Sequence, residues 1–430
     1  MRLYKITFIP FILFMLVSLT SSAAYSGAAA GGAALLARQA GVSDNYEKFT
    51  ADKLTLDEGK TILSGEWGDL ELTPVIVQPS EDFIATQTDF DELINLFNSS
   101  SRWTFRGMSL DQIRAMFHQA GLAEEVCDLL MQHTHESDDG NGFVTVPHDA
   151  ILWSLTPEIK AKLYPLIGKY GDNIMYGQPL CFNSGDKNEW IYKSSLSKSL
   201  AEKLLQLVYT ENGICYISDI HLILPFLETA EDWNGLLRTI YRTRACDLSL
   251  VIREGQNVDE ITDYWGNLGR QAYVRTIFEQ ASDTPGGSGV DISAVLPEIP
   301  RERINTYSGI AEYLNDWKDC HWTTINFFNS APDERYYGLA DFASFFGKIS
   351  RPLDSSPLKF GDIIAVYDES GELMHTCIYI AGNVVLTKNG AGSLKPFIFS
   401  SLDKTVSLYG NRVEYLIRTV ADTYTVAVQE

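Results

Sequence analysis

Apolar residues recur at helical intervals through the middle of the chain. In "SLDQIRAMFHQAG" they follow Ser109 and Gln112, which have the spacing of a capping box. In "TPEIKAKLY" Thr156 is the expected N-cap and Pro157 the first helical residue. The stretches "LSKSLAEKLLQLVY" and "DEITDYWGNLGRQAYVRTIFEQA" are also amphipathic, whereas "CDLSLVI" alternates as a strand does. We therefore expect a mainly α-helical domain, or two that pack together, over residues 87–281.

The pattern changes after residue 281. "SDTPGGSGVD" is rich in Gly, Ser and Pro, which predicts that a linker over residues 282–302 begins there. A helical pattern over residues 307–329 is followed by four apolar strand patterns: "KFGDIIAVYD", "LMHTCIYIAG", "NVVLTKN" and "VEYLIRT". A helix followed by antiparallel strands predicts a compact α+β domain over residues 303–425.

The N-terminus has the three parts of an export signal. "MRLYK" supplies Arg2 and Lys5, "ITFIPFILFMLVSL" supplies a short apolar core and "TSSAA" supplies small residues for cleavage, which predicts a signal peptide over residues 1–24. The apolar run is shorter than the about 20 residues that cross a bilayer, so we expect a periplasmic or extracellular protein with no membrane span after cleavage. An uncleaved anchor is the alternative. The Ala- and Gly-rich residues that follow predict a tether and an irregular segment over residues 25–86.

Charge and cysteine content narrow the range of functions. The formal net charge is −22 and Lys and Arg form no cluster, which argues against nucleic acid as a partner. The six cysteines are irregularly spaced and form no C-x-x-C, so neither a structural zinc site nor a thioredoxin-like site is indicated. A disulfide between Cys181 and Cys215 stays open, and a buried thiol is expected for each cysteine outside the C-terminal region.

One acidic loop has part of the pattern of a calcium-binding loop. "SDDGNGFV" matches the EF-hand register at Asp139, Asn141 and Gly142. Ser137 stands at the first position, however, and His148 stands at the twelfth, where an EF-hand has its bidentate glutamate. We therefore interpret the segment as a turn, and we expect no metal or organic cofactor in the chain.

Cys320, His375 and Asn389 are the candidate catalytic residues. Asp319 is the expected N-cap of a helix, which sets Cys320 in the first turn, where peptide N–H groups stabilise a thiolate. His375 opens an apolar strand and could act as the base for that thiol, and Asn389 on the next strand could hold the imidazole. Taken alone, each residue has a simpler explanation: a buried thiol, a strand-end histidine and the turn residue of "KNG". His321 is a poor base for Cys320 because adjacent helical residues point in different directions.

Residues 303–420 resemble the NlpC-type and CHAP-type cysteine amidases and peptidases, which are compact papain-like domains. The resemblance depends on Cys320 at the head of a helix, on "FGDIIAVYD", in which Gly361 and Asp362 open a strand, and on "HTCIYIAGN" as the strand led by a histidine. It implies a papain-like fold with an antiparallel sheet, a Cys-His-Asn triad, and peptides derived from peptidoglycan as substrates.

Two positions depart from the pattern of that family. Cys377 stands two residues after the histidine, where glycine is frequent, and shares the face of the histidine on a strand. It could be a small filler, a second thiol or a disulfide partner that inactivates Cys320. The third position is often His in the NlpC group, and a slip of one residue would turn Lys388 or Thr387 inward in place of Asn389.

The sequence thus predicts an exported cysteine hydrolase that cleaves an amide or peptide bond. The helical region would shape the cleft or bind a partner. Two alternatives stay open: a binding protein that has kept the fold without turnover, and a transglutaminase-like acyltransferase. The latter class shares the order Cys then His but has Asp as its third residue, so Asn389 counts against it.

Overall fold

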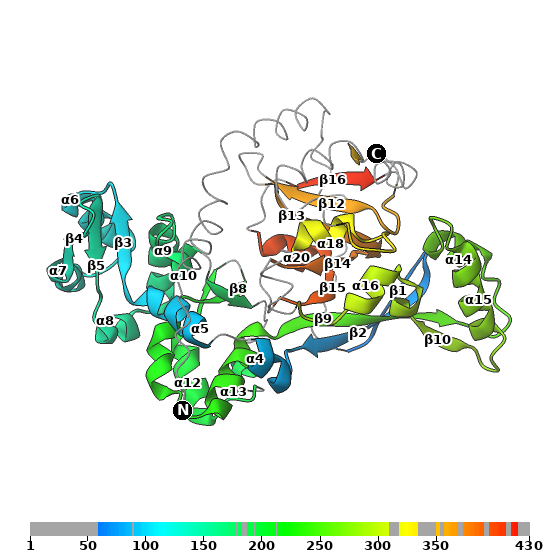
Figure 1. Cartoon of the computed structure of the whole chain (residues 1–430), viewed down its shortest axis with the longest axis horizontal. Helices are drawn as coiled ribbons and strands as arrows, with labels where there is room; N and C mark the ends of the chain where they lie inside the picture. The colour runs from blue at the N-terminus through cyan, green and yellow to red at the C-terminus, as the bar shows by residue number, and fades with distance from the viewer. Residues whose placement is uncertain are drawn as a thin grey trace, which may run out of the picture.

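The computed structural model combines helices with four antiparallel sheets, so the prediction of a mixed α+β architecture is confirmed (Figure 1). The papain-like fold stays a prediction. The structure describes residues 59–87, 90–177, 179–182, 187–192, 194–211, 213–308, 318–333, 350–352, 357–367, 373–390, 395–409 and 414–419. The predicted signal peptide and the Ala- and Gly-rich tether lie outside these residues. Within them, no helix is both long enough and apolar enough to cross a membrane.

One hydrophobic core is built from residues 84–240. Its helices are α4 (Glu81–Gln87), α5 (Phe90–Asn98), η1 (Ser99–Ser101), α6 (Leu110–Gln119), α7 (Glu124–Gln132), α8 (Asp149–Ser154), α9 (Pro157–Ile167), α10 (Ile174–Gly177), α11 (Lys187–Tyr192), α12 (Lys198–Leu207), η2 (Ile220–Phe226) and α13 (Ala230–Tyr241). Two small sheets, which the sequence does not predict, lie among them. One has the order β3 (Trp103–Arg106), β5 (Gly142–Thr145), β4 (Thr134–Glu136), and the other β6 (Leu180–Phe182), β8 (Ile214–Ile217), β7 (Tyr209–Glu211).

Local capping signals fix the first residues of two of these helices, α6 and α9, as predicted. Ser109 and Gln112 form both hydrogen bonds of a capping box at the start of α6. The Thr156 hydroxyl accepts the N–H of Ile159, and Pro157 is the first residue of α9.

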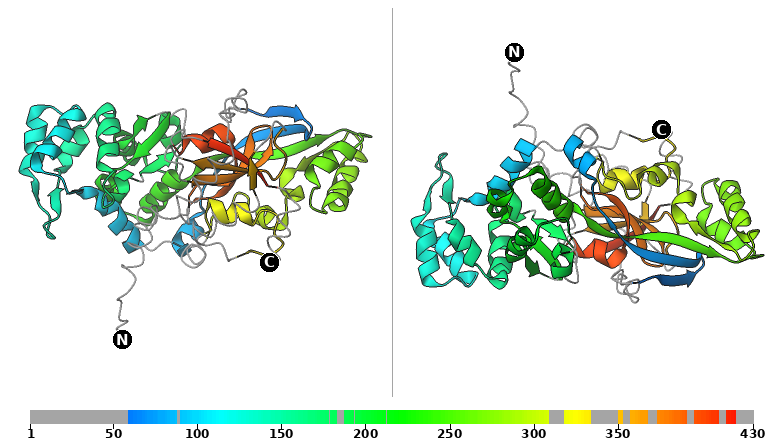
Figure 2. Two further views of the ribbon diagram at one scale, coloured as in Figure 1. Left: turned by 90° about the horizontal axis from the view of Figure 1, so that it is seen from above. Right: turned by 90° about the horizontal axis from the view of Figure 1, so that it is seen from below.

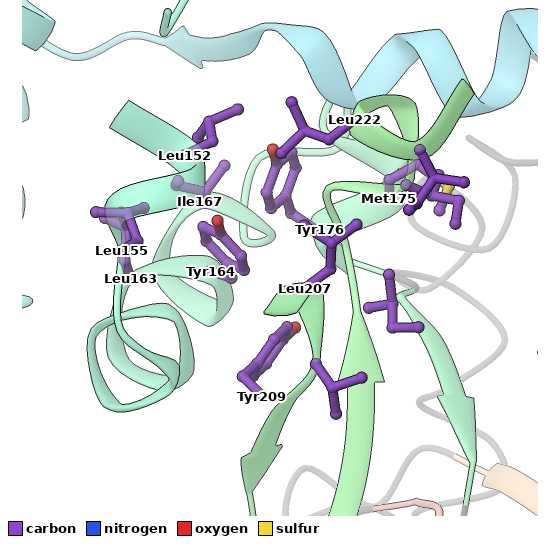
Figure 3. Packing of buried hydrophobic residues seen from close by; sticks show 14 of the residues in the cluster. Leu152, Leu155, Leu163, Tyr164, Ile167, Met175, Tyr176, Leu207, Tyr209 and Leu222 are labelled. Carbon is purple, nitrogen blue, oxygen red and sulfur yellow. The ribbon is translucent and has the colours of Figure 1, made fainter. Parts of the chain in front are cut away.

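Tyrosines and leucines fill the centre of this first core (Figure 3). A fully buried ion pair lies beside these tyrosines. Lys160 Nζ is 3.1 Å from Asp219 Oδ2, and neither side chain is exposed. The Tyr164 hydroxyl donates to the Asp219 carboxylate, and the single proton of the Tyr176 hydroxyl is shared between Asp219 Oδ1 at 2.9 Å and the Ser100 carbonyl at 2.8 Å. The buried carboxylate is therefore next to one cation and two hydroxyls.

The second core spans two sheets. The first has the order β1 (Thr61–Gly65), β2 (Gly68–Val77), β9 (Thr243–Ile252), β10 (Ser288–Asp291), and α14 (Asp259–Trp265) and α15 (Gln271–Ser282) pack on it. "CDLSLVI" is part of β9, as its alternation predicts. Figure 2 shows β9 running from the first core past the C-terminal sheet toward α14 and α15. The sequence predicts one helical domain, or two that pack together, over residues 87–281, and in the structure the first core ends at residue 240 and the second contains β9.

The second sheet has six strands. Their order is β11 (Ser350–Pro352), β16 (Glu414–Thr419), β12 (Ile363–Tyr367), β13 (Leu373–Ala381), β14 (Val384–Lys388), β15 (Phe397–Ser401). The helix α18 (Cys320–Ile325) packs on β13, and α20 (Leu402–Ser407) follows β15. The four strands predicted from the sequence correspond to β12, β13, β14 and β16, whereas β11 and β15 are not predicted.

Two of the predicted segments differ in the structure. The segment 25–86, expected to be irregular, contains the hairpin β1–β2, whose strand β2 pairs with β9 along its whole length. The expected linker 282–302 contains β10, η3 (Ile292–Val295) and most of α16 (Glu298–Arg303), and buries Ile292 and Val295 in the second core. Its glycines make a turn rather than a linker, since Gly286 and Gly287 have φ of 85° and 78° just before β10.

Candidate functional site

Cys320 begins α18, as predicted. The Asp319 carboxylate caps the helix by accepting the N–H of Trp322 at 2.9 Å. The thiol is nearly inaccessible, since Cys320 is only 6% exposed. Burial raises the pKa of the Cys320 thiol and the Asp319 carboxylate adds to this, while the backbone N–H groups of Thr376, His321 and Cys320 lower it by a smaller amount. Those three N–H groups are the donors that would stabilise a thiolate here.

His375 lies on β13 and is fully buried. Its Nε2 is 2.9 Å from the Thr387 hydroxyl, which in turn donates to Asn389 Oδ1 at 3.0 Å. Because the single hydroxyl proton of Thr387 goes to Asn389, Nε2 must carry the ring proton that it donates to Thr387. Nδ1 then carries the lone pair, and this atom has no hydrogen-bond partner among the described residues. His375 therefore has the tautomer of a base whose acceptor nitrogen is Nδ1.

The ring of His375 is also held by stacking. It lies on the ring of Tyr409 with centroids 4.3 Å apart and planes inclined by 20°. Burial lowers the pKa of His375 well below its ordinary value, and the neighbouring His321 lowers it further. The imidazole is thus neutral at physiological pH, and its lowered pKa makes it a weak base in this buried state.

Thr376 connects β13 to α18. Its hydroxyl donates to the Cys320 carbonyl at 3.3 Å and lies 3.0 Å from His321 Nδ1. Since successive side chains on a strand point to opposite faces, His375 points away from α18. No hydrogen bond between Cys320 Sγ and the His375 ring occurs within the described part of the chain. The structure therefore brings two of the three predicted residues together: His375 and Asn389 belong to one relay, whereas the Cys320 thiol lies beside the strand backbone at residue 376 without contacting the relay.

The sequence does not single out Thr387 as the direct partner of His375. An alternation signal was present, because Thr387 in β14 and Asn389 just after it are two residues apart, with Lys388 between them on the other face. Lys388 is fully buried on that other face, where its Nζ donates to the Gly390 carbonyl at 3.0 Å. The inward residue next to the imidazole is therefore Thr387, with Asn389 behind it.

All six cysteines are free thiols, so neither a Cys181–Cys215 nor a Cys320–Cys377 disulfide is present. Cys377 is 1% exposed and packs among apolar residues such as Ile364 and Val385, where burial raises the pKa of its thiol. Its surroundings are those of a small apolar filler.

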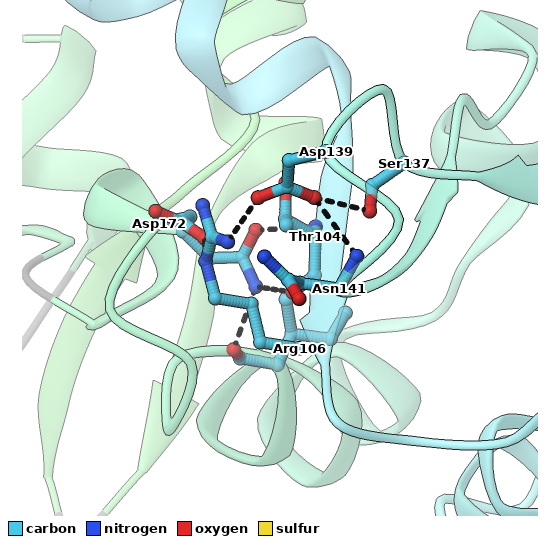
Figure 4. Close-up of polar contacts among 8 residues, drawn as sticks. Thr104, Arg106, Ser137, Asp139, Asn141 and Asp172 are labelled. Atoms are coloured by element: carbon cyan, nitrogen blue, oxygen red, sulfur yellow. Dashed lines mark hydrogen bonds and ion pairs between the residues drawn. The ribbon is translucent and has the colours of Figure 1, made fainter.

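Two groups of polar residues contain side chains that could serve as metal ligands. In the segment "SDDGNGFV" the Asp139 carboxylate is occupied by Arg106, the Ser137 hydroxyl and the Asn141 N–H, which supports the interpretation as a turn (Figure 4). Asp319, Cys320 and His321 each offer one ligand atom, and these three atoms lie within 4.8 Å of one another. Among the described residues they form the one cluster that could hold a metal ion.

Comparison of the chain with protein-family models, with curated proteins and with solved structures found no match. The resemblance to NlpC-type and CHAP-type amidases stays a prediction from the residues that carry it.

Proposed function

We propose that the chain is a cysteine hydrolase that cleaves an amide or peptide bond. Cys320 is the nucleophile, His375 is the general base and then the general acid, and Asn389 orients the imidazole through the Thr387 hydroxyl. The observation that carries the proposal is the state of His375. One of its nitrogens is fixed as a donor in a relay, and the other is a buried lone pair with no partner among the described residues.

In the proposed reaction His375 Nδ1 takes the proton of the Cys320 thiol, and the thiolate attacks the carbonyl carbon of the substrate. The backbone N–H groups near Cys320 stabilise the oxyanion of the tetrahedral intermediate. His375 then gives its proton to the leaving amine, and a thioester on Cys320 remains. Water, deprotonated by His375, hydrolyses the thioester and releases the carboxylic acid.

This chemistry requires the thiol and Nδ1 to come within about 2.6–3.2 Å of each other, a contact that often tightens only when substrate binds. It also requires the His375 ring, which points away from α18, to turn toward the thiol, and the 6% exposed thiol to become accessible. We therefore assign the described state to a closed form of the site. Export and a substrate derived from peptidoglycan belong to the proposal through the signal-like N-terminus and the family resemblance alone.

The acyl-enzyme provides the test. The full-length protein is incubated with p-nitrophenyl acetate, and each cysteine peptide is analysed by mass spectrometry. We expect acetyl transfer to Cys320, loss of it in Cys320→Ser, a strong reduction in His375→Gln, and no change in the matched buried-thiol control Cys377→Ser. Added glycinamide separates hydrolysis from acyl transfer, because a transferase forms acetylglycinamide. Equal acetylation of all cysteines, unaffected by His375→Gln, would refute the proposal.

A binding protein without turnover is the second candidate. The His375 ring points away from α18 and is stacked on Tyr409, which favours this candidate because a ring fixed in that position stays apart from the Cys320 thiol. This candidate predicts no acetylation of Cys320 under any condition in which the protein stays folded.

A further inference from the structure

The Asp319–Cys320–His321 cluster contains three different donor types: a carboxylate oxygen, a thiol sulfur and an imidazole nitrogen. These are the donors that Zn²⁺ accepts, with bonds of about 2.0–2.3 Å in tetrahedral geometry. Such bonds set the donor atoms about 3.5 Å apart. The ligand atoms of the cluster lie within 4.8 Å of one another, so side-chain rotations that move each atom by about 1 Å would let all three bind one ion.

The local backbone produces this convergence. Asp319 is extended, with φ −97° and ψ −163°, and the chain turns into α18 directly after it. Its Oδ1 accepts the Trp322 N–H, which fixes the carboxylate while its second oxygen can serve as a ligand. The ligand atoms of three consecutive side chains therefore lie within 4.8 Å of one another.

A second interaction orients the histidine. The Thr376 hydroxyl lies 3.0 Å from His321 Nδ1, 2.9 Å from the Thr324 hydroxyl and 3.3 Å from the Cys320 carbonyl. Because Thr376 holds Nδ1, Nε2 is the ring nitrogen that would bind the ion. A hydrogen bond from the second ring nitrogen is what fixes the tautomer and ring plane of metal-binding histidines. Thr376 provides this interaction from β13.

Another thiol–histidine contact in the chain lacks this arrangement. Cys127 Sγ lies 3.7 Å from His118 Nδ1, but His118 Nε2 pairs with Glu124 at 3.3 Å. Among the described residues only the ligand atoms of Asp319, Cys320 and His321 form a cluster that could hold a metal ion, so Cys127, His118 and Glu124 do not form one.

We propose that Asp319, Cys320 and His321 bind a thiophilic divalent cation of the Zn²⁺ class, and that the ion switches the site off by taking the Cys320 thiolate as a ligand. Binding releases the thiol proton to solvent, and the thiolate electron pair is then donated to the metal rather than to a substrate carbonyl. The fourth coordination position is left for water. The inhibitory role depends on the proposed hydrolase, whereas the binding does not.

Binding is tested first, with EDTA-treated full-length protein and Zn²⁺ in isothermal titration calorimetry. Co²⁺ is used as a spectroscopic probe, because thiolate ligation gives an intense charge-transfer band. We expect one equivalent of Zn²⁺ to bind and Mg²⁺ not to compete. Thr376→Val should weaken binding by about 10–100-fold, as loss of an orienting bond does. Asp319→Asn, which keeps a good N-cap, and His321→Gln should weaken it further, and Cys377→Ser should have no effect.

The inhibitory role is tested by repeating the p-nitrophenyl acetate reaction with and without Zn²⁺. Blocked acetylation of Cys320 that EDTA reverses is the expected result, and His321→Gln should be resistant to Zn²⁺. Absence of binding, or binding that Asp319→Asn and His321→Gln leave unchanged, overturns the metal site. Bound Zn²⁺ with undiminished acetylation overturns the inhibition alone. If Cys320 is never acetylated although Zn²⁺ binds, the hydrolase fails, and the switch with it, while the metal site stands.

Discussion

The Thr387 hydroxyl is the link between His375 and Asn389, and Thr387→Val removes it with little change of shape. Thr387 is 1% exposed and His375 is fully buried, so water cannot replace the hydroxyl. The His375 Nε2–H then has no acceptor. A buried donor without a partner costs about 1–3 kcal/mol, and we expect Thr387→Val to lower the free energy of unfolding by this amount.

Thr405→Val is the matched control. Thr405 lies in α20, is fully buried, and its hydroxyl has no hydrogen-bond partner among the described residues. The same chemical change therefore removes a desolvated hydroxyl without breaking a bond. Its effect should be neutral or stabilising, because an unsatisfied polar group is replaced by an apolar one.

Urea unfolding followed by tryptophan fluorescence measures both variants, and an unchanged slope would confirm that only stability differs. Nitrogen chemical shifts of the His375 ring report its tautomer. In the wild type they should show a protonated Nε2, and in Thr387→Val a mixture of tautomers. Equal stabilities of Thr387→Val and Thr405→Val, with an unchanged tautomer, would refute the relay.

Three other predictions concern the rest of the chain and use the same unfolding assay. Asp219→Asn should lower the free energy of unfolding by about 3–5 kcal/mol because it leaves the Lys160 ammonium buried without a counter-charge. Lys160→Met should cost less because the Tyr164 hydroxyl still donates to the Asp219 carboxylate, and the reverse order would contradict this. Burial lowers the pKa of His221. The contribution of its neutral ring to the free energy of unfolding is therefore complete above the unfolded pKa of about 6.5 and is lost as the pH falls toward the folded pKa. His221→Gln should reduce the dependence of the free energy of unfolding on pH in this window by up to about 1.4 kcal/mol per pH unit. An unchanged slope would show that His221 is not buried as a neutral ring. Gly361→Ala should lower the free energy of unfolding more than Gly107→Ala does. Both glycines have positive φ, but a Cβ at Gly361 would lie 2.3 Å from the Phe328 ring, whereas one at Gly107 would meet nothing within 4 Å. Equal losses of stability in the two variants would argue against the close packing of Phe328 on Gly361.

Local signals in the sequence were sufficient for many elements. Ser109 with Gln112, Thr156 with Pro157, and Asp319 before Cys320 each specify a helix start through contacts within four residues, and the structure has all three. Alternation likewise identified β9, and a short apolar run identified β13. These predictions succeed because the interactions that decide them lie within a single element.

The pairing of strands that are far apart in the chain has no comparable local signal in the sequence. Strand β2 pairs with β9 in a register that sets Asp69 opposite Val251, and no pattern within residues 25–86 indicates that partner. The same limit applies to the site. The sequence sets Cys320 at the start of a helix and His375 on a later strand, and it does not show whether the two meet. The alternation of Thr376 and His375 across β13 becomes meaningful only once α18 is known to pack on the Thr376 face.

The central claim is that His375 activates Cys320, and alkylation by iodoacetamide tests it most directly. In EDTA-treated protein at neutral pH, the rates at Cys320 and at Cys377 are compared by peptide mass spectrometry. The two thiols are 6% and 1% exposed, so Cys377 serves as an internal reference of similar burial. We predict that Cys320 reacts faster than Cys377 and that His375→Gln removes the difference. If Cys320 reacts no faster than Cys377, or if His375→Gln leaves its rate unchanged, the base and the nucleophile are not a pair.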